Sequence, residues 1–423
     1  MQMLSTLAVP GSRSRELELR AAALLILCDP PPQACSALEH LSATEWQRLL
    51  LWLDTSGLAL YFYDRLKDLS SERILPTDVS ARLQQNLADN TARTEGLIGE
   101  MFRIHREFQR ASLRYAMLKG LTLWPSSVPR PELRSQLDLD FLVADECADE
   151  ARRILESRGY HLRAISGRSW EFKKNETPGA SLRHLYKDVP FRSVELHIES
   201  RVEARFPLLA RAEMRSFRDV DIPVLSSADL FLGQGMHAFK HVCSEFSRTA
   251  HLIEFRRHVI ARHDDTSFWT EVRARAEATP KAVIALGVVT LLITHVMGNF
   301  APWSFANWTI DRMPASARLW VQLYGERTVL ASFPGSKLYL LLQKELASSG
   351  VPSRRSLRQA LLPLRPPPLI VHANANEELP MRLRRYRAQF RFILFRLRFH
   401  IVEGVRYLRE SLRWQQYMNG VAL

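Results

Sequence analysis

Two aspartates one residue apart offer the clearest chemistry in this sequence. Asp138 and Asp140 alternate with large apolar residues in the run Leu137–Val143. Alternation is the period of a β-strand, so both carboxylates point to one face. Neighbouring carboxylates repel each other and are costly to bury unless a cation lies between them. Oxygen ligands of this kind suit Mg²⁺, or Mn²⁺ in its place, together with substrate phosphates. The alternative is a solvated edge strand.

Lys119 and Gly120 supply what the opposite side of such a site needs. They end a short apolar segment, Tyr115–Leu118, which predicts a strand. Glycine lets the backbone approach a phosphate closely, and lysine carries a compact positive charge. The pair therefore predicts a contact to phosphate. The alternative for Lys119 is a surface lysine at the end of a strand.

A second alternating run, Arg192–Glu199, carries further polar residues on one face. Glu195, His197 and Glu199 share that face, while the apolar residues between them share the other. Either glutamate can complete a set of three carboxylates, and either can equally be a solvated residue of the strand. His197 is a secondary candidate, which would orient Glu195 or touch the substrate.

A later helix, predicted from Ser226 to about Val242, presents basic residues together. His237, Lys240 and His241 lie at i, i+3 and i+4, which is one helix face. They would line the acceptor side of a site, or the two histidines would bind a metal at that spacing. Because no HExxH motif accompanies them, we favour a packing role.

The elements that must position these residues divide the chain into four parts. Its 423 residues predict two or three domains. Helical periodicity dominates residues 1–113, strand patterns appear in 114–225, and helices return in 226–362. Residues 363–423 combine a proline-rich linker, Pro363–Pro368, with a basic amphipathic helix. The pattern predicts an α+β protein.

Local signals define several of the helices. Ser42 and Glu45 form a capping box that opens a helix. Gly159 ends an amphipathic helix that begins at Asp145. The apolar run Ala282–Gly298 is barely long enough to span a bilayer and contains polar residues, so we predict a core helix and no transmembrane segment.

The net charge of +13 indicates a polyanionic partner. A nucleoside triphosphate, nucleic acid and an anionic membrane surface all fit, and an arginine-rich composition bias fits equally well. Residues 381–423 interleave arginines with phenylalanines, which suits contact with RNA or an anionic membrane. The same pattern suits a helix that packs its phenylalanines onto the protein. Four scattered cysteines without a CxxC motif predict reduced thiols and a cytoplasmic protein, peripheral to a membrane if the tail binds one.

In their order and rough spacing, these pieces resemble the uncharacterised bacterial nucleotidyltransferases of the DNA-polymerase-β superfamily. The resemblance covers roughly residues 20–262 and rests on Leu118-Lys119-Gly120, Arg134, Asp138–Val143, Arg158-Gly159-Tyr160 and Val194–His197. It implies a small mixed β-sheet with helices on one side, embedded between mainly helical N- and C-terminal regions. It also implies transfer of a nucleoside monophosphate from a triphosphate such as ATP to an acceptor, with two Mg²⁺ ions.

The resemblance also implies a role for each matching residue. Its metal ligands and catalytic residues are Asp138, Asp140 and Glu195, and its nucleotide-binding residues are Lys119, Gly120 and Arg134. Glu195 is favoured over Glu199 and would also help to deprotonate the acceptor. The alternative for Arg134 is an ion pair with Glu132 or the edge of the sheet.

One position departs from the family pattern. Leu137 stands where the superfamily usually has a small polar residue, so a hydroxyl that could help to hold triphosphate or metal is missing. A catalytically weak or inactive protein that binds nucleotide or RNA is therefore the first alternative function. A peripheral membrane protein is the second. The acceptor of the lead hypothesis is a small molecule, a sugar, a protein or an RNA end.

Overall fold

Four helices precede the sheet in the computed structural model, which describes residues 14–175, 184–188, 192–200, 207–351, 356–362 and 379–421. They are α1 (Arg15–Leu25), α2 (Ala43–Ser56), α3 (Ala59–Asp68) and the long α4 (Thr77–Arg110). The predicted capping box is confirmed, because the Ser42 hydroxyl accepts from the Glu45 N–H while the Glu45 carboxylate accepts from the Ser42 N–H. The predicted linker Pro363–Pro368 lies outside the described residues.

One mixed sheet of seven strands follows, in the order β3-β4-β5-β2-β1-β7-β6. The strands are β1 (Tyr115–Met117), β2 (Asp138–Ala144), β3 (His161–Ser166), β4 (Ser169–Lys174), β5 (Arg192–Glu199), β6 (Glu213–Phe217) and β7 (Val220–Val224). The β2–β5 and β1–β7 pairs are parallel and the others antiparallel. The sequence did not indicate β6 or β7.

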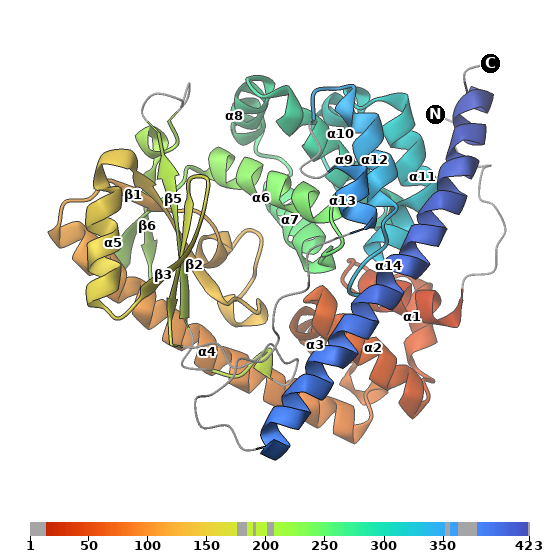
Figure 1. Cartoon of the computed structure of the whole chain (residues 1–423). Coiled ribbons are helices and arrows are strands. Elements are labelled where there is room, and N and C mark those ends of the chain that lie inside the picture. Colours follow the sequence, from red (N-terminus) through yellow and green to blue (C-terminus); the bar gives the residue numbers. More distant parts are fainter. Residues whose placement is uncertain are drawn as a thin grey trace.

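The two faces of the sheet have opposite characters. Helices α4 and α5 (Ala148–Ser157) cover one face; in Figure 1 α5 lies to the left of the strands and α4 runs below them. There the apolar residues of β2 and β5 join α4 and α5 in one buried cluster, which includes Leu97, Met101, Phe108, Leu139, Phe141, Leu155, Val194 and Leu196. Because side chains alternate along a strand, the polar residues of β2 and β5 point to the other face.

A group of helices follows the sheet. They are α6 (Ser227–Val242), α7 (Thr249–Ala261), α8 (Thr266–Glu277), α9 (Pro280–Met297), α10 (Trp303–Asp311), α11 (Ala315–Val329), α12 (Tyr339–Ala347) and α13 (Leu357–Leu361). Figure 1 shows α6 and α7 between the sheet and the other helices. The prediction for Ala282–Gly298 is confirmed, because α9 is a core helix in which Leu286, Val289 and Leu292 are fully buried.

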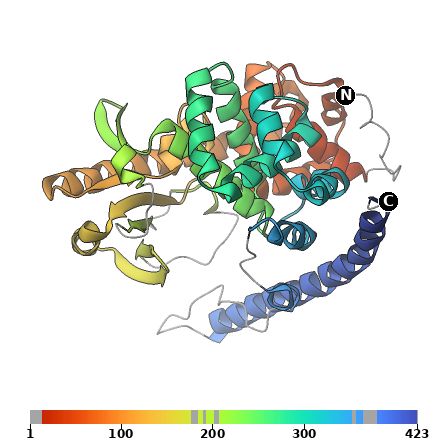
Figure 2. The same cartoon turned by 90° about the horizontal axis from the view of Figure 1, so that it is seen from above.

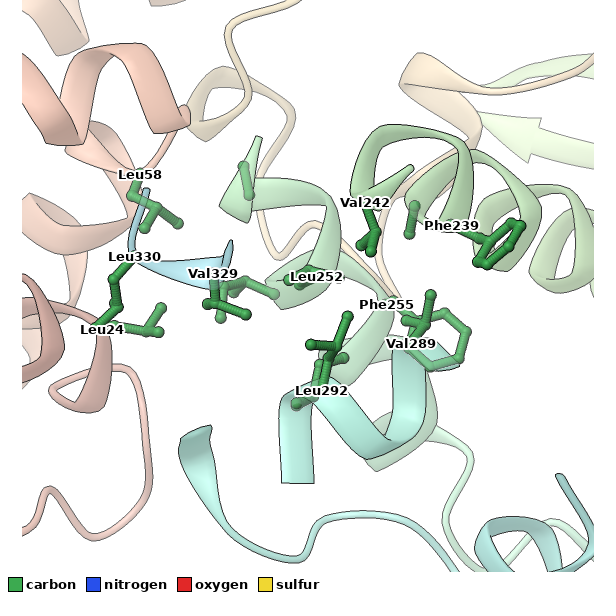
Figure 3. Packing of buried hydrophobic residues seen from close by; sticks show 14 of the residues in the cluster. Leu24, Leu58, Phe239, Val242, Leu252, Phe255, Val289, Leu292, Val329 and Leu330 are labelled. Carbon is green, nitrogen blue, oxygen red and sulfur yellow. The ribbon is translucent and has the colours of Figure 1, made fainter. Parts of the chain in front are cut away.

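A single hydrophobic cluster joins the N-terminal helices to the helices after the sheet. Figure 3 shows Leu24 and Leu58 of the first part packed near Val329 and Leu330, with Leu252 beside them. The segments before and after the sheet therefore share one core. The predicted division of the chain at residues 113, 225 and 362 stays a prediction.

The last helix, α14 (Leu379–Val421), runs along one side of the molecule in Figure 2. Tyr407 and Trp414 are buried, and the Trp414 indole donates to Glu345 at 2.9 Å. Among the described residues, no helix combines the length and the apolar character needed to cross a membrane. The predicted α+β class, with a mixed sheet set between helical regions, is confirmed.

Candidate active site

The register between β2 and β5 brings two of the predicted carboxylates side by side. Asp140 lies directly opposite Glu195 in this parallel pair, and Asp138 lies opposite Ser193. Side chains at paired positions of neighbouring strands point to the same face. One ligand atom from each of Asp140, Glu195 and His197 lies within 4.8 Å of the others. The strands alone therefore assemble this three-residue group.

Two basic side chains neutralise the carboxylates. Lys119 Nζ lies 3.0 Å from Asp140 Oδ1. His197 Nε2 lies 3.3 Å from Asp140 Oδ1 and 3.3 Å from Glu195 Oε2. Lys119 is thus the partner of a buried carboxylate and not a free surface lysine. His197 connects two carboxylates from neighbouring strands.

The pKa values follow from these contacts. Burial would lower the pKa of His197, but hydrogen bonds to Asp140 and Glu195 raise it to about 9. Burial would raise the pKa of Asp140, but the hydrogen bond from His197 and the Lys119 ammonium bring it below the usual value. At neutral pH the group therefore holds charged His197 and Lys119 against ionised Asp140.

Asp138 is the third of the predicted metal ligands. It lies outside the close group of Asp140, Glu195 and His197. Burial, together with the neighbouring Asp140 carboxylate, raises the pKa of Asp138 to about 6. This is the behaviour expected of two like charges that share a buried face. A cation bound between Asp138 and Asp140 would remove that repulsion.

The turn after β1 depends on Gly120. Its φ is +76°, in the left-handed region that favours glycine, and a Cβ at this position would overlap the Gln136 amide. Gln136 Nε2 in turn donates to the Asp138 carbonyl at 2.6 Å. The absence of a Cβ at Gly120 therefore lets the Gln136 side chain pack against its backbone. Its predicted contact with phosphate stays a prediction.

Arg134 pairs with a residue far away in the sequence. Its Nε donates to Glu254 Oε1 on α7 at 3.1 Å, and Tyr61 donates to the same oxygen at 3.1 Å. The alternative pairing with Glu132 is wrong in this structure. Burial would raise the pKa of Glu254, but Arg134 and His251 lower it to about 2. Nothing in the sequence near Glu254 signalled this contact.

A cavity of about 680 Å³ opens beside the carboxylate group. Lys119, Arg134 and His197 line it from the sheet side, and α6, α7, α8 and α9 supply the opposite wall. Arg211 and Arg275 also line it, each held by Asp229 at 2.9 Å. These four lysine and arginine side chains are already paired with carboxylates, so a polyanionic ligand in the cavity would share or replace those ion pairs.

The other candidates occupy different places. Glu199 lies opposite Ala144, and its carboxylate accepts from the Leu208 and Leu209 N–H groups at 2.5 and 3.3 Å. It therefore binds the backbone at Leu208 and Leu209 and is not beside Asp140. His237 and His241 project from α6, and His237 lines the cavity. Leu137 is half-exposed at the start of β2.

A comparison with known protein families identifies the family of this chain. A family model described as "Uncharacterised nucleotidyltransferase" matches residues 42–298, more than half of the chain. The chain belongs to this family. The matched segment contains the whole sheet, the carboxylate group and helices α6 to α9. The predicted enzyme class, a nucleotidyltransferase, is thereby confirmed. Its placement in the DNA-polymerase-β superfamily and its bacterial source stay predictions.

Two further comparisons add little. No curated protein matches the chain. Among solved structures, an antigenic nucleotidyltransferase-like protein from Paracoccidioides brasiliensis is similar at 11% identity, covering 47% of this chain and 91% of that one with a TM-score of 0.27.

Proposed function

We propose that this member of the nucleotidyltransferase family transfers a nucleoside monophosphate from a nucleoside triphosphate to an acceptor hydroxyl, in a reaction that depends on Mg²⁺ or Mn²⁺. The observation that carries the proposal is the β2–β5 register, which sets Asp140 beside Glu195 with Asp138 on the same face. Lys119 and His197 balance part of the negative charge of this group. Asp138, whose charge is opposed by the neighbouring Asp140, would gain from a bound cation.

The donor set fits a hard divalent cation. Asp138, Asp140 and Glu195 offer only carboxylate oxygens, which Mg²⁺ and Mn²⁺ prefer. These three residues would hold the metal. A metal bound there would neutralise phosphate charge and align the attacking and leaving oxygens. The cationic residues nearby show that the protein already compensates the same carboxylates with its own side chains.

The remaining roles belong to residues of this chain. Lys119 and Arg134 face the cavity, where they would bind the phosphate oxygens of the triphosphate. Glu195 would accept the proton of the acceptor hydroxyl. His197 would fix the orientation of Glu195 and Asp140, since its Nε2 contacts both carboxylates. Positioning and charge compensation are the main demands of phosphoryl-group chemistry.

The test is nucleotide-dependent pyrophosphate release by the full-length protein. Each α-labelled NTP is incubated with Mg²⁺ or Mn²⁺ and with small-molecule, sugar, protein and RNA fractions. The double variant Asp138→Asn/Asp140→Asn is compared with wild type. We expect transfer of label to one fraction by the wild type alone. Nucleotide binding without transfer by either protein would instead support a binding protein that retains the fold.

A specific observation favours a second function for α14. One face of this helix packs on the protein through Tyr407 and Trp414, whereas Phe390, Leu394 and Leu397 are about half-exposed or more. Arginines flank these apolar residues along the helix. We propose that the exposed face with Phe390, Leu394 and Leu397 contacts an anionic membrane surface, because exposed apolar side chains beside arginines suit the lipid interface.

Vesicle flotation tests the membrane proposal. The full chain should float with anionic vesicles and not with neutral ones, and Phe390→Glu/Leu394→Glu should abolish flotation. Because Tyr407 and Trp414 support the fold, point variants are preferable to deletion of residues 381–423. Binding of RNA in place of vesicles, or flotation unchanged in the variant, would contradict this assignment.

A further inference from the structure

Three histidines converge beside the cavity, apart from the carboxylate group. His237 and His241 lie one turn apart on α6, and His251 lies in the first turn of α7. Their ring centroids are 4.5–4.7 Å apart in all three pairs. One nitrogen from each ring lies within 4.8 Å of the others. The short connection between α6 and α7 creates this arrangement.

Contacts of Nδ1 orient two of these rings. His241 Nδ1 lies 2.8 Å from the Phe246 carbonyl, which only accepts, so Nδ1 of His241 carries the hydrogen and the lone pair lies on Nε2. His251 Nδ1 lies 3.6 Å from Glu254 Oε2, an electrostatic contact beyond hydrogen-bond distance. Histidines that bind metals usually present one nitrogen while the other donates to a carbonyl or carboxylate.

We propose that His237, His241 and His251 form a second metal site, which takes Zn²⁺ or a similar transition-metal ion. Three imidazoles match the ligand number of open zinc sites, which keep a fourth position for water or substrate. A tetrahedral ion with bonds of about 2.0–2.1 Å holds its ligands roughly 3.3 Å apart. Rotations of the side chains about their own bonds would close the present separation to that value.

The charge around the three histidines indicates what occupies the fourth position. The positive charges of Lys119 and Arg134 help to lower the pKa of His237, and Arg248 does the same for His241 and His251. Glu254 is the nearby carboxylate. Because these cations oppose a bare divalent ion, we expect the fourth ligand to be an anionic oxygen. His237 and His251 line the same cavity as Lys119 and Arg134. A phosphate or carboxylate bound in the cavity can therefore reach the metal.

This inference goes beyond the proposed nucleotidyl transfer and does not depend on it. The histidine site uses neutral nitrogen ligands from two helices, whereas the transfer site uses carboxylates from two strands. Nitrogen ligands favour Zn²⁺, Co²⁺ or Ni²⁺ over Mg²⁺. Substitutions can therefore remove the ligands of one site and leave the ligands of the other site unchanged.

Cobalt spectroscopy tests the second site directly. The full-length protein, without a histidine tag and after treatment with a chelator, is titrated with Co²⁺. We expect one Co²⁺ per chain with the strong visible absorption of a low-coordinate site, and its displacement by Zn²⁺. His237→Gln and His251→Gln should each weaken Co²⁺ binding by about a hundredfold or more, since loss of an outer partner alone costs 10–100-fold.

Matched controls separate the possible outcomes. His263→Gln changes an exposed histidine on the loop after α7 and should retain the spectrum. Asp140→Asn should also retain the Co²⁺ spectrum. This variant therefore distinguishes failure of the histidine site from failure of the transfer mechanism. The partly exposed His241→Gln provides a variant if His251→Gln does not fold, and Zn²⁺ should raise the melting temperature of wild type but not of that variant. Absorption and Zn²⁺-dependent melting that are unchanged in His237→Gln and His241→Gln would overturn the proposal.

Discussion

The two polar clusters that border the cavity treat histidine in opposite ways. In the sheet cluster, contacts to Asp140 and Glu195 raise the pKa of His197 to about 9. In the helix cluster, burial lowers the pKa of His251 to about 4, although Glu254 is its neighbour. The difference is that His197 contacts two carboxylates, whereas the more deeply buried His251 has one, Glu254, and has His241 and Arg248 beside it. A histidine is thus charged or neutral according to how many carboxylates remain available to it.

This comparison separates two kinds of cation chemistry on one cavity. The sheet cluster is rich in carboxylates and holds two basic side chains against them. The helix cluster offers neutral imidazoles that keep lone pairs available. Hard ions such as Mg²⁺ suit the carboxylates of the sheet cluster, and borderline ions such as Zn²⁺ suit the imidazoles of the helix cluster. Removing one cluster should therefore leave the cation preference of the other intact.

The largest effect is expected from Asp140→Asn in the sheet cluster. It removes the carboxylate that Lys119 and His197 both contact, so we expect NTP-dependent transfer to fall by at least about a hundredfold. The exposed Asp145→Asn, directly after β2, is the matched control and should remain active. Pyrophosphate release measures both, and thermal unfolding checks that each variant is folded. Full activity of Asp140→Asn would remove the sheet cluster from the mechanism.

Glu254→Gln tests the residue that joins the clusters. Glu254 contacts Arg134 on the sheet side and His251 on the helix side. Loss of its charge leaves Arg134 largely buried without its partner, which should reduce the free energy of unfolding by about 3–5 kcal/mol. Denaturant unfolding measures the change. Glu277→Gln, from the exposed pair with Arg273, should cost less than about 1 kcal/mol. Equal costs for the two variants would show that Glu254 does not connect the clusters.

Gly120→Ala should perturb the sheet cluster through its backbone. The positive φ and the overlap with Gln136 predict a loss of about 1–3 kcal/mol in the free energy of unfolding. Gly404→Ala is the control, because its Cβ meets no neighbour in α14 and should stabilise that helix by about 0.5–1 kcal/mol. Denaturant midpoints compare the two. A neutral Gly120→Ala would mean that the turn relaxes without cost.

The smallest effect is expected from Leu137→Ser. Leu137 is 47% exposed, so its replacement should change the free energy of unfolding by less than about 0.5 kcal/mol. The added hydroxyl supplies the small polar residue that the resemblance to the superfamily implies at this position, and we expect transfer at least as fast as in wild type. Steady-state rates at several NTP concentrations provide the measurement. A slower variant would indicate that the leucine itself contributes to substrate binding.

Local patterns in the sequence were sufficient where neighbours along the chain decide the structure. The alternation around Asp138 and Asp140 predicted β2 and its polar face, and the helix predicted from Ser226 matches the start of α6. Strand β6 escaped prediction because it does not alternate clearly, and β7 because it is short and contains Pro223, although Val220, Ile222 and Val224 do alternate. Their identity as strands depends on pairing with each other and with β1.

What the sequence determined by itself is the chemistry of each strand and helix: two aspartates on one face, a lysine and a glycine after a short strand, and two histidines one helical turn apart. Only the tertiary structure decided which of these residues meet. The register between β2 and β5 placed Glu195, and not Glu199, beside Asp140. The packing of α7 brought His251 to the α6 histidines and Glu254 to Arg134. These contacts join segments far apart in the chain, where local periodicity carries no information about distance.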